Sequence, residues 1–278
     1  MSDAVIPVGL KIRELEVEGA AGPLAARLYA GGAPGSKRDG LVVFFHSGGF
    51  VGGDLDESDE FLRHLASCSL PNLVLSACYT LATKHPFPAA VEDAHAVLKW
   101  VKKNKSKLGW TGKRLVVAGI EAGANLAAVS ALMSRDRGGP ELAGQILIMP
   151  MLDPGLSTCS MREIPAEAHM ASMADTCAAS YRGYLPNAAD RIHPYASPLQ
   201  SSRLKNLPPA LILSSEDDPL RDEAEQYGAK LVASGVTTTV KRMAQVPLDD
   251  ATDRNECACK AAALHEIGNF LTVLEEPS

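Results

Sequence analysis

The sequence contains few aromatic residues and neither a long apolar run nor a basic stripe. Phe, Trp and Tyr make up 5% of the 278 residues. No apolar run approaches the ~20 residues that a membrane-spanning helix needs. Lysine and arginine are dispersed, and the formal net charge is −6. These absences exclude a membrane helix, and they argue against nucleic acid or an anionic membrane surface as partners.

A secretory signal and a disulfide pattern are also lacking. The first residues, MSDAVIPVGLKIR, contain no basic segment followed by an apolar one, so we expect a soluble, cytoplasmic protein. The six cysteines show no framework spacing. Cys257 and Cys259 are too close together for a typical zinc knuckle and have no matching Cys or His pair, so we interpret them as ordinary helix residues. We expect no metal and no cofactor.

Apolar runs alternate with helix-like segments from residue 41 onward. Continuous apolar runs of this kind are typical of strands in a parallel sheet that is covered on both faces. The sequence therefore predicts a three-layer α/β fold with a mostly parallel central sheet. The expected strands are 41–45, 73–78, 114–118, 144–149, 210–214 and 237–243, and the expected helices are 57–68, 88–104, 122–135, 220–234 and 256–274.

We expect a single domain over residues 1–278, with a small helical cap. The segments LEVEG and LAARLYA near the N-terminus predict an antiparallel hairpin. Residues 155–197 interrupt the alternation, and Met170, Met173 and Cys177 within them have helical spacing. An insertion at this place lies where α/β folds bind ligands. We therefore predict a cap formed by about 1–40 and 155–197, although the methionines can equally pack on the core.

Two glycine-rich turns follow predicted strands. The first, HSGGFVGGD (46–54), can turn backbone N–H groups toward a substrate oxygen. The second, VVAGIEAGANL (116–126), has the small residues of a sharp strand-to-helix turn, with Glu121 at its centre. A carboxylate is favoured at the helix N-terminus that follows. Glu121 can therefore fold back toward the donors of the first turn.

Taken together, these segments resemble the hormone-sensitive lipase family of α/β-hydrolases, which includes bacterial acetyl esterases and carboxylesterases. The resemblance covers about residues 41–274 and implies an α/β-hydrolase fold. It places the oxyanion hole and ligand pocket at His46, Ser47, Gly48, Gly49 and Ala122. The matching segments are HSGG (46–49), HPFPAAVED (85–93), GIEAGAN (119–125), HPYASPL (193–199), DDPLRDEAE (217–225) and VKRMAQVPLDD (240–250).

The resemblance also places the catalytic triad, with Glu121 at the nucleophile, Asp218 at the acid and Leu248 at the histidine. In such a triad the histidine takes the proton of serine, and the acid orients the histidine. Leucine cannot accept a proton, and glutamate cannot form the ordinary acyl-enzyme. None of the seven histidines of the chain is an obvious replacement. Asp218 then needs another partner, for which Arg221 or a nearby backbone N–H is the candidate.

These residues favour a protein that has lost ester hydrolysis and binds a small molecule or a partner. Two enzymatic alternatives stay open: a carboxylesterase or lipase-type hydrolase with Glu121 as nucleophile, and a lyase or isomerase with Glu121 as general base. A protein that folds but has no remaining function is a further alternative. A homodimer is also expected, because residues 236–242 read as a β-branched edge strand, through which members of the family associate.

Overall fold

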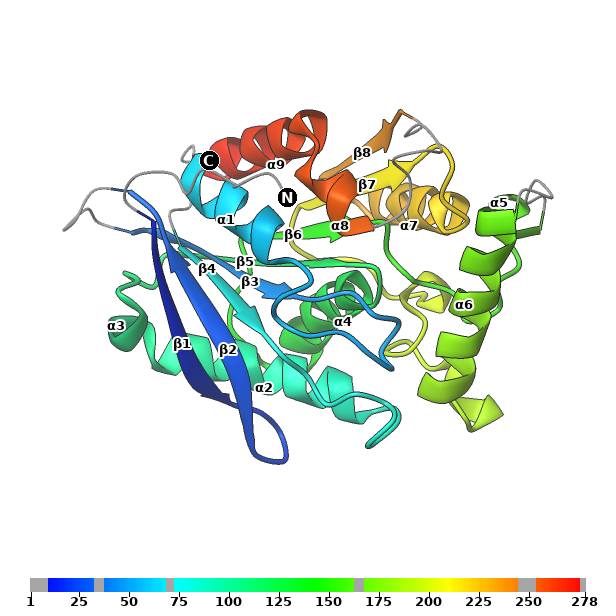
Figure 1. The fold of residues 1–278 in the computed structure, drawn as a ribbon, viewed down its shortest axis with the longest axis horizontal. Helices are drawn as coiled ribbons and strands as arrows, with labels where there is room; N and C mark the ends of the chain where they lie inside the picture. The colour runs from blue at the N-terminus through cyan, green and yellow to red at the C-terminus, as the bar shows by residue number, and fades with distance from the viewer. Residues whose placement is uncertain (1–9, 33–37, 69–72, 163–167, 245–253, 276–278) are drawn as a thin grey trace.

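The structure, a computed structural model, describes residues 10–32, 38–68, 73–162, 168–244 and 254–275 (Figure 1). Within these residues eight strands form one sheet in the order β1-β2-β4-β3-β5-β6-β7-β8. The first two pairs, β1 with β2 and β2 with β4, are antiparallel, and all other pairs are parallel. The strands are β1 (Lys11–Glu18), β2 (Pro23–Ala30), β3 (Gly40–Phe45), β4 (Leu73–Ala77), β5 (Arg114–Ile120), β6 (Gly144–Ile148), β7 (Ala210–Ser215) and β8 (Thr238–Met243).

Helices cover both faces of the sheet, which confirms the predicted three-layer α/β fold. One core cluster joins α2, α4 and α7 to one face, and a second joins α1, α8 and α9 to the other (Figure 1). The helices are α1 (Asp59–Cys68), α2 (Ala89–Lys103), α3 (Lys105–Leu108), α4 (Ala122–Arg137), α5 (Cys159–Arg162), α6 (Ala168–Tyr184), α7 (Arg221–Ala233), α8 (Arg254–Cys259) and α9 (Ala261–Val273), with 3-10 turns at Ala188–Ile192 and Pro198–Gln200.

The central strands are apolar because both of their faces are covered. Every residue of β3, β4, β6 and β7 is buried, and so is every residue of β5 after its first. Side chains that point to opposite faces of a strand therefore enter the two different core clusters. This is why the five strands read as continuous runs rather than as an alternation of apolar and polar residues.

The N-terminal hairpin belongs to the sheet. Residues 11–30, which we assigned to a cap element spanning about 1–40, form β1 and β2, and β2 pairs with β4 in the register Ala26↔Ala77. The buried side chains of Val17, Ala26 and Leu28 pack into the core beside α2. The hairpin prediction is confirmed, whereas its place is at the edge of the sheet and not above the pocket.

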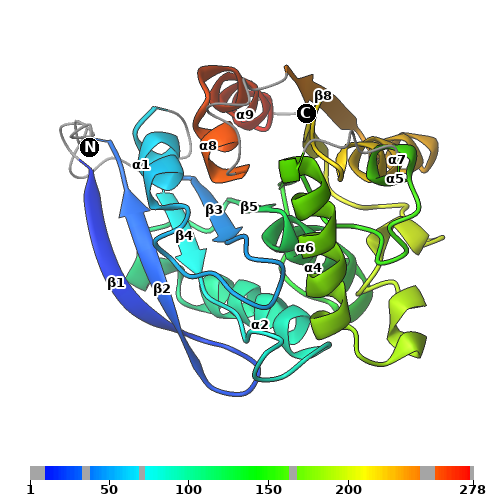
Figure 2. The ribbon, with the colours of Figure 1, turned by 45° about the vertical axis from the view of Figure 1, so that its right-hand side comes forward.

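Helix α6 is the longest helical element of the 155–197 insertion, which also contains α5 and the 3-10 turn at Ala188–Ile192. It stands beyond the end of the sheet where β3 finishes (Figures 1 and 2). The ring of Tyr184 stacks on Phe50, with centroids 3.7 Å apart and planes 5° apart. A Cβ atom on Gly49 would lie 2.1 Å from the hydroxyl oxygen of Ser180. Helix α6 therefore lies directly against the glycine-rich loop that follows β3.

Strand β8 lies at the edge of the sheet, as predicted. Its exposed side chains include Val240, and the homodimer expected through this edge stays a prediction. Among the residues that the structure describes, no helix combines the length and apolarity needed to cross a bilayer.

Candidate active site

Glu121 sits at the turn between β5 and α4. Its backbone has φ of 56° and ψ of −112°, a region that costs a non-glycine residue on the order of 1–3 kcal/mol. The surroundings hold this conformation: the Glu121 amide donates to the Ile148 carbonyl at 3.0 Å, and the Met151 amide donates to the Glu121 carbonyl at 3.1 Å. The strained residue is therefore the one whose side chain is presented at the end of the sheet.

Two glycines make this turn possible. A Cβ atom on Gly119 would lie 2.2 Å from the carbonyl of Gly123, and one on Gly123 would lie 2.0 Å from the Phe45 carbonyl oxygen. Contacts this short between nonbonded atoms do not occur in packed proteins. A larger residue at Gly119 would force β5 and α4 apart, and one at Gly123 would force α4 away from the end of β3. The small residues noted in the sequence are thus a steric requirement of the turn.

The carboxylate of Glu121 accepts hydrogen bonds from the backbone of the loop after β3. The amides of Gly48 and Gly49 donate to its Oε2 at 2.8 Å and 3.1 Å. Both glycines have positive φ, of 107° and 60°, which turns their N–H groups to the same side of the loop. Glu121 is only 6% exposed. The structure therefore places a side-chain anion in the position that the family resemblance assigns to the oxyanion hole.

His46 and Ser47, also predicted for this pocket, make other contacts. The His46 ring stacks on Tyr79 with centroids 4.3 Å apart, and burial lowers its pKa, which keeps the imidazole neutral. The hydroxyl of Ser47 donates to Glu57 Oε2 and accepts from Asn255 Nδ2, both at 3.0 Å. These two side chains hold the shape of the loop. Ala122 is buried at the first position of α4.

Asp218, the predicted triad acid, is paired with Arg254. Its Oδ2 accepts from Arg254 Nε at 2.8 Å, and its Oδ1 accepts from Arg254 Nη2 at 3.2 Å and from the Leu220 amide at 2.7 Å. The predicted backbone partner of Asp218 is thereby confirmed. Of the two candidates, the backbone N–H is therefore the partner, since the guanidinium of Arg221 binds Asp222 and the Glu216 carbonyl.

Arg254 joins the two acidic positions of the site. Its Nη1 donates to Glu121 Oε1 at 3.0 Å while its Nε and Nη2 bind Asp218. Burial alone would lower the pKa of Arg254, but the carboxylates of Asp218 and Glu121 outweigh it and raise that pKa well above the usual value. The guanidinium therefore stays charged in a side chain that is 13% exposed. Sequence reasoning missed this residue.

Arg254 thus connects Asp218 to Glu121, and Glu121 connects it to the amides of Gly48 and Gly49. Leu248, placed at the missing histidine, lies outside the described residues. Cys177 of α6 lies near the same guanidinium, with its Sγ 4.0 Å from Arg254 Nη2, and burial raises the pKa of its thiol to about 12. Cys257 and Cys259 lie in α8 and pack against the core beside the sheet.

Glu223 is a further carboxyl buried beneath the site. Its Oε1 accepts from the Leu152 amide at 2.6 Å, and the residue is 0% exposed. Burial raises the pKa of Glu223 well above its usual value. A carboxyl whose pKa rises on folding binds more protons in the native state than in the unfolded state. Its contribution to the free energy of unfolding therefore falls as pH rises from the unfolded pKa toward the folded one.

We expect the free energy of unfolding of Glu223→Gln, relative to that of wild type, to increase as pH rises from about 5 to about 8. The amide keeps the shape of the side chain and cannot ionise. The measurement is urea unfolding of both proteins at the two pH values. Glu225→Gln on the same helix is the matched control, because Arg242 lowers the pKa of Glu225. A carboxyl whose pKa is lowered on folding contributes its full stability above the unfolded pKa of ~4.3. The difference in unfolding free energy between Glu225→Gln and wild type should therefore not change between the two pH values. A flat difference for Glu223→Gln would contradict the prediction.

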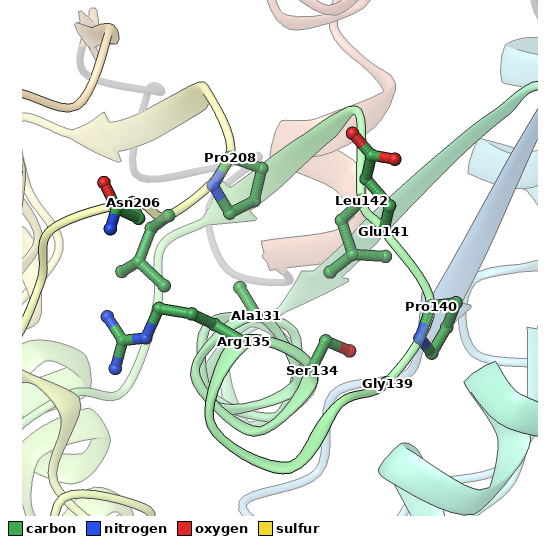
Figure 3. A pocket seen from close by; sticks show the side chains of 10 residues that line it. Ala131, Ser134, Arg135, Gly139, Pro140, Glu141, Leu142, Asn206 and Pro208 are labelled. Atoms are coloured by element: carbon green, nitrogen blue, oxygen red, sulfur yellow. The ribbon is translucent and has the colours of Figure 1, made fainter.

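A hollow lies at the other end of α4. Figure 3 shows this crevice of about 380 Å³ between the end of the helix and the loops that lead into β6 and β7. From Glu121 to Ser134, which lines it, the helix rises ~20 Å. The crevice is therefore separate from the candidate active site. Its lining residues are Ala131, Ser134, Arg135, Gly139, Pro140, Glu141, Leu142, Asn206, Leu207 and Pro208.

Known proteins share this fold. A family model described as the alpha/beta hydrolase fold matches residues 42–249. Esterase LipI of Mycobacterium tuberculosis is 38% identical over 83% of this chain and 72% of the relative. Carboxylesterase NlhH of the same organism is 38% identical over 73% of this chain and 65% of the relative. The crystal structure of a thermostable esterase from Pseudomonas putida has a TM-score of 0.86 and 32% identity, over 98% of this chain and 85% of that one.

These matches define the class of protein. The chain has the α/β-hydrolase fold, and it belongs to the α/β-hydrolase family as a homologue of the hormone-sensitive-lipase-like esterases. The mostly parallel sheet, the turn at Glu121 and the loop of Gly48 and Gly49 occur in the chain order expected for that fold.

Proposed function

We propose that this chain binds a small molecule in the α/β-hydrolase pocket and does not hydrolyse esters. The observation that carries the proposal is the Glu121 carboxylate on the amides of Gly48 and Gly49. In ester hydrolysis such amides stabilise the negative charge that develops on the carbonyl oxygen. An anion already bound to them competes with the transition state for the same donors.

Arg254 supports the same proposal, because it bridges the residues at the nucleophile and acid positions. It lies between Glu121 and Asp218, within hydrogen-bond distance of both. A guanidinium remains protonated at any ordinary pH and has no acceptor atom. It cannot take a proton from a nucleophile or from water.

The charges of the pocket favour a neutral or cationic ligand. Glu121 and Asp218 carry two negative charges against the single positive charge of Arg254. Helix α6 stands over this end of the sheet, where its Tyr184 stacks on Phe50 (Figure 2). Native mass spectrometry of the purified protein should reveal a bound small molecule as a discrete mass increment that is lost on unfolding.

A carboxylesterase is the second candidate. The names of the relatives support ester hydrolysis more directly than binding alone, and this chain retains the loop donors and the acid. In that mechanism a Glu121 oxygen attacks the ester carbonyl, the bond to the alkoxide breaks, and a water proton converts the alkoxide to the alcohol. A hydroxide or water then cleaves the resulting anhydride, which releases the acid and restores the Glu121 carboxylate. A lyase or isomerase has less support, because three donors already occupy the oxygens of Glu121.

We expect no burst and no turnover above the buffer rate with short-chain 4-nitrophenyl esters at neutral pH, because Glu121 occupies the Gly48 and Gly49 amides and the guanidinium of Arg254 lies between Glu121 and Asp218. Release of nitrophenol is the measurement, on protein shown to be folded by circular dichroism. Turnover that disappears in Glu121→Gln would overturn the proposal in favour of the carboxylesterase. Glu141→Gln, an exposed carboxylate at the distant crevice, is the matched control and should leave any such turnover unchanged.

A further inference from the structure

Three donors converge on one carboxylate in this pocket. The amides of Gly48 and Gly49 bind Oε2 of Glu121, at 2.8 Å and 3.1 Å. Arg254 Nη1 binds the other oxygen, Oε1, at 3.0 Å. Both oxygens are thus engaged from different elements of the fold. Charge-assisted hydrogen bonds of this kind are stronger than neutral ones, so the donor set is suited to a carboxylate.

The donors are held in place by contacts that do not involve Glu121. The Val51 and Gly52 amides donate to the Gly48 carbonyl at 3.1 Å and 3.0 Å, which closes the loop on itself. Asp218 holds the Arg254 guanidinium through two hydrogen bonds. Removing the side chain of Glu121 therefore leaves the three donors in position with no acceptor.

We infer that Gly48, Gly49 and Arg254 form a binding site for small monocarboxylates, and that Glu121 is its built-in occupant. One negative charge suits the site, because Asp218 already balances most of the charge of Arg254. A dianion would add a second buried negative charge without a cation to pair with it. Glu121 is 6% exposed, so the site is shielded from water and can discriminate by charge.

Because the Glu121 carboxylate is covalently attached beside these donors, it keeps free carboxylates out of the site in the wild-type chain. A group attached through two methylenes competes with free ligands as if it were present at very high concentration. External carboxylates, including the acids that ester hydrolysis releases, are therefore excluded from the wild-type site. The inferred carboxylate site rests on the proposed function in one respect: no substrate carbonyl uses the amides of Gly48 and Gly49 in the wild-type chain.

The test removes the tethered carboxylate and supplies a free one. Glu121→Gly is the variant of choice because glycine adopts the positive φ of this position without strain. We expect sodium acetate to raise the Tm of the variant saturably, by about 5 °C when acetate is in hundredfold excess over its Kd. Acetamide and sodium chloride at the same concentrations should not, and wild type should show no acetate-specific shift.

A second substitution locates the site. Adding Arg254→Gln to Glu121→Gly should abolish the acetate response, whereas adding Arg242→Gln, at a surface pair with Glu225, should preserve it. Equal shifts with acetate and acetamide, or the same shift in wild type, would overturn the inference. Glu121→Ala is the second variant, and failure of both to fold would refute the claim that the donors are held without Glu121. Ester turnover by wild type would overturn the proposed function while leaving acetate binding by the variant intact.

Discussion

Replacing Arg254 with alanine should lower the free energy of unfolding by about 3–5 kcal/mol. The substitution leaves the carboxylates of Glu121 and Asp218, which are 6% and 4% exposed, without their shared cation. A buried charge that loses its partner keeps its desolvation cost. The measurement is urea unfolding at neutral pH, followed by circular dichroism, with the slope of the transition compared to wild type.

Arg221→Ala is the matched control for this prediction. The guanidinium of Arg221 also pairs with a carboxylate, that of Asp222, but in a more exposed setting, so we expect a loss below about 1 kcal/mol. Adding Glu121→Gln to Arg254→Ala should recover part of the lost stability, since one of the two unpaired charges disappears. A loss below about 1 kcal/mol for Arg254→Ala would show that the three groups are not a buried ionic unit.

Helix α8 connects the two halves of the site through adjacent residues. Arg254 binds Asp218 and Glu121. Asn255, the next residue, binds the hydroxyls of Ser47 and Ser58. The same short helix therefore secures the loop after β3 and the end of β7. In a serine hydrolase a histidine has to move protons between these elements; here they are held by static ionic and amide contacts.

The sheet could be predicted from sequence because its central strands are buried on both faces and read as unbroken apolar runs. The turn at Glu121 could also be predicted from sequence, since the close approach of Gly119 and Gly123 admits only small residues. The hairpin of residues 11–30 was predicted but misplaced. An alternating antiparallel pair suits either a cap or a sheet edge, and its pairing with β4 is a long-range contact that the local pattern does not encode.

Arg254 was missed because no local motif surrounds it. Its role comes from contacts with Glu121 and Asp218, which are 133 and 36 residues away along the chain. One physical signal was available: two acidic positions predicted to share a buried pocket without a histidine require a cation. The two acidic positions therefore require a nearby Lys or Arg, but the sequence has 27 such residues and no local pattern distinguishes Arg254 among them.

Restoring ester hydrolysis should require three substitutions. Glu121→Ser with Leu248→His supplies a nucleophile and a base, but Arg254 would still bind both oxygens of Asp218. The introduced histidine then has no acid to orient it. Adding Arg254→Ala frees Asp218 and clears the space between it and the turn. We expect the triple variant to exceed the double variant by about 10-fold to 100-fold in kcat/KM for a 4-nitrophenyl ester, because triad members act as a unit.

The comparison needs two further proteins, each checked for folding. Arg254→Ala with Glu121→Ser lacks the base and should be as inactive as the double variant, because freeing Asp218 alone supplies no proton acceptor. Arg254→His with Glu121→Ser places the imidazole beside Asp218 instead of at Leu248. If this protein is more active than the triple variant, position 254 and not Leu248 corresponds to the histidine. If a folded triple variant is no more active than the double, the Arg254–Asp218 pair is not what blocks catalysis, and the pocket differs from that of the esterases at more than these three positions.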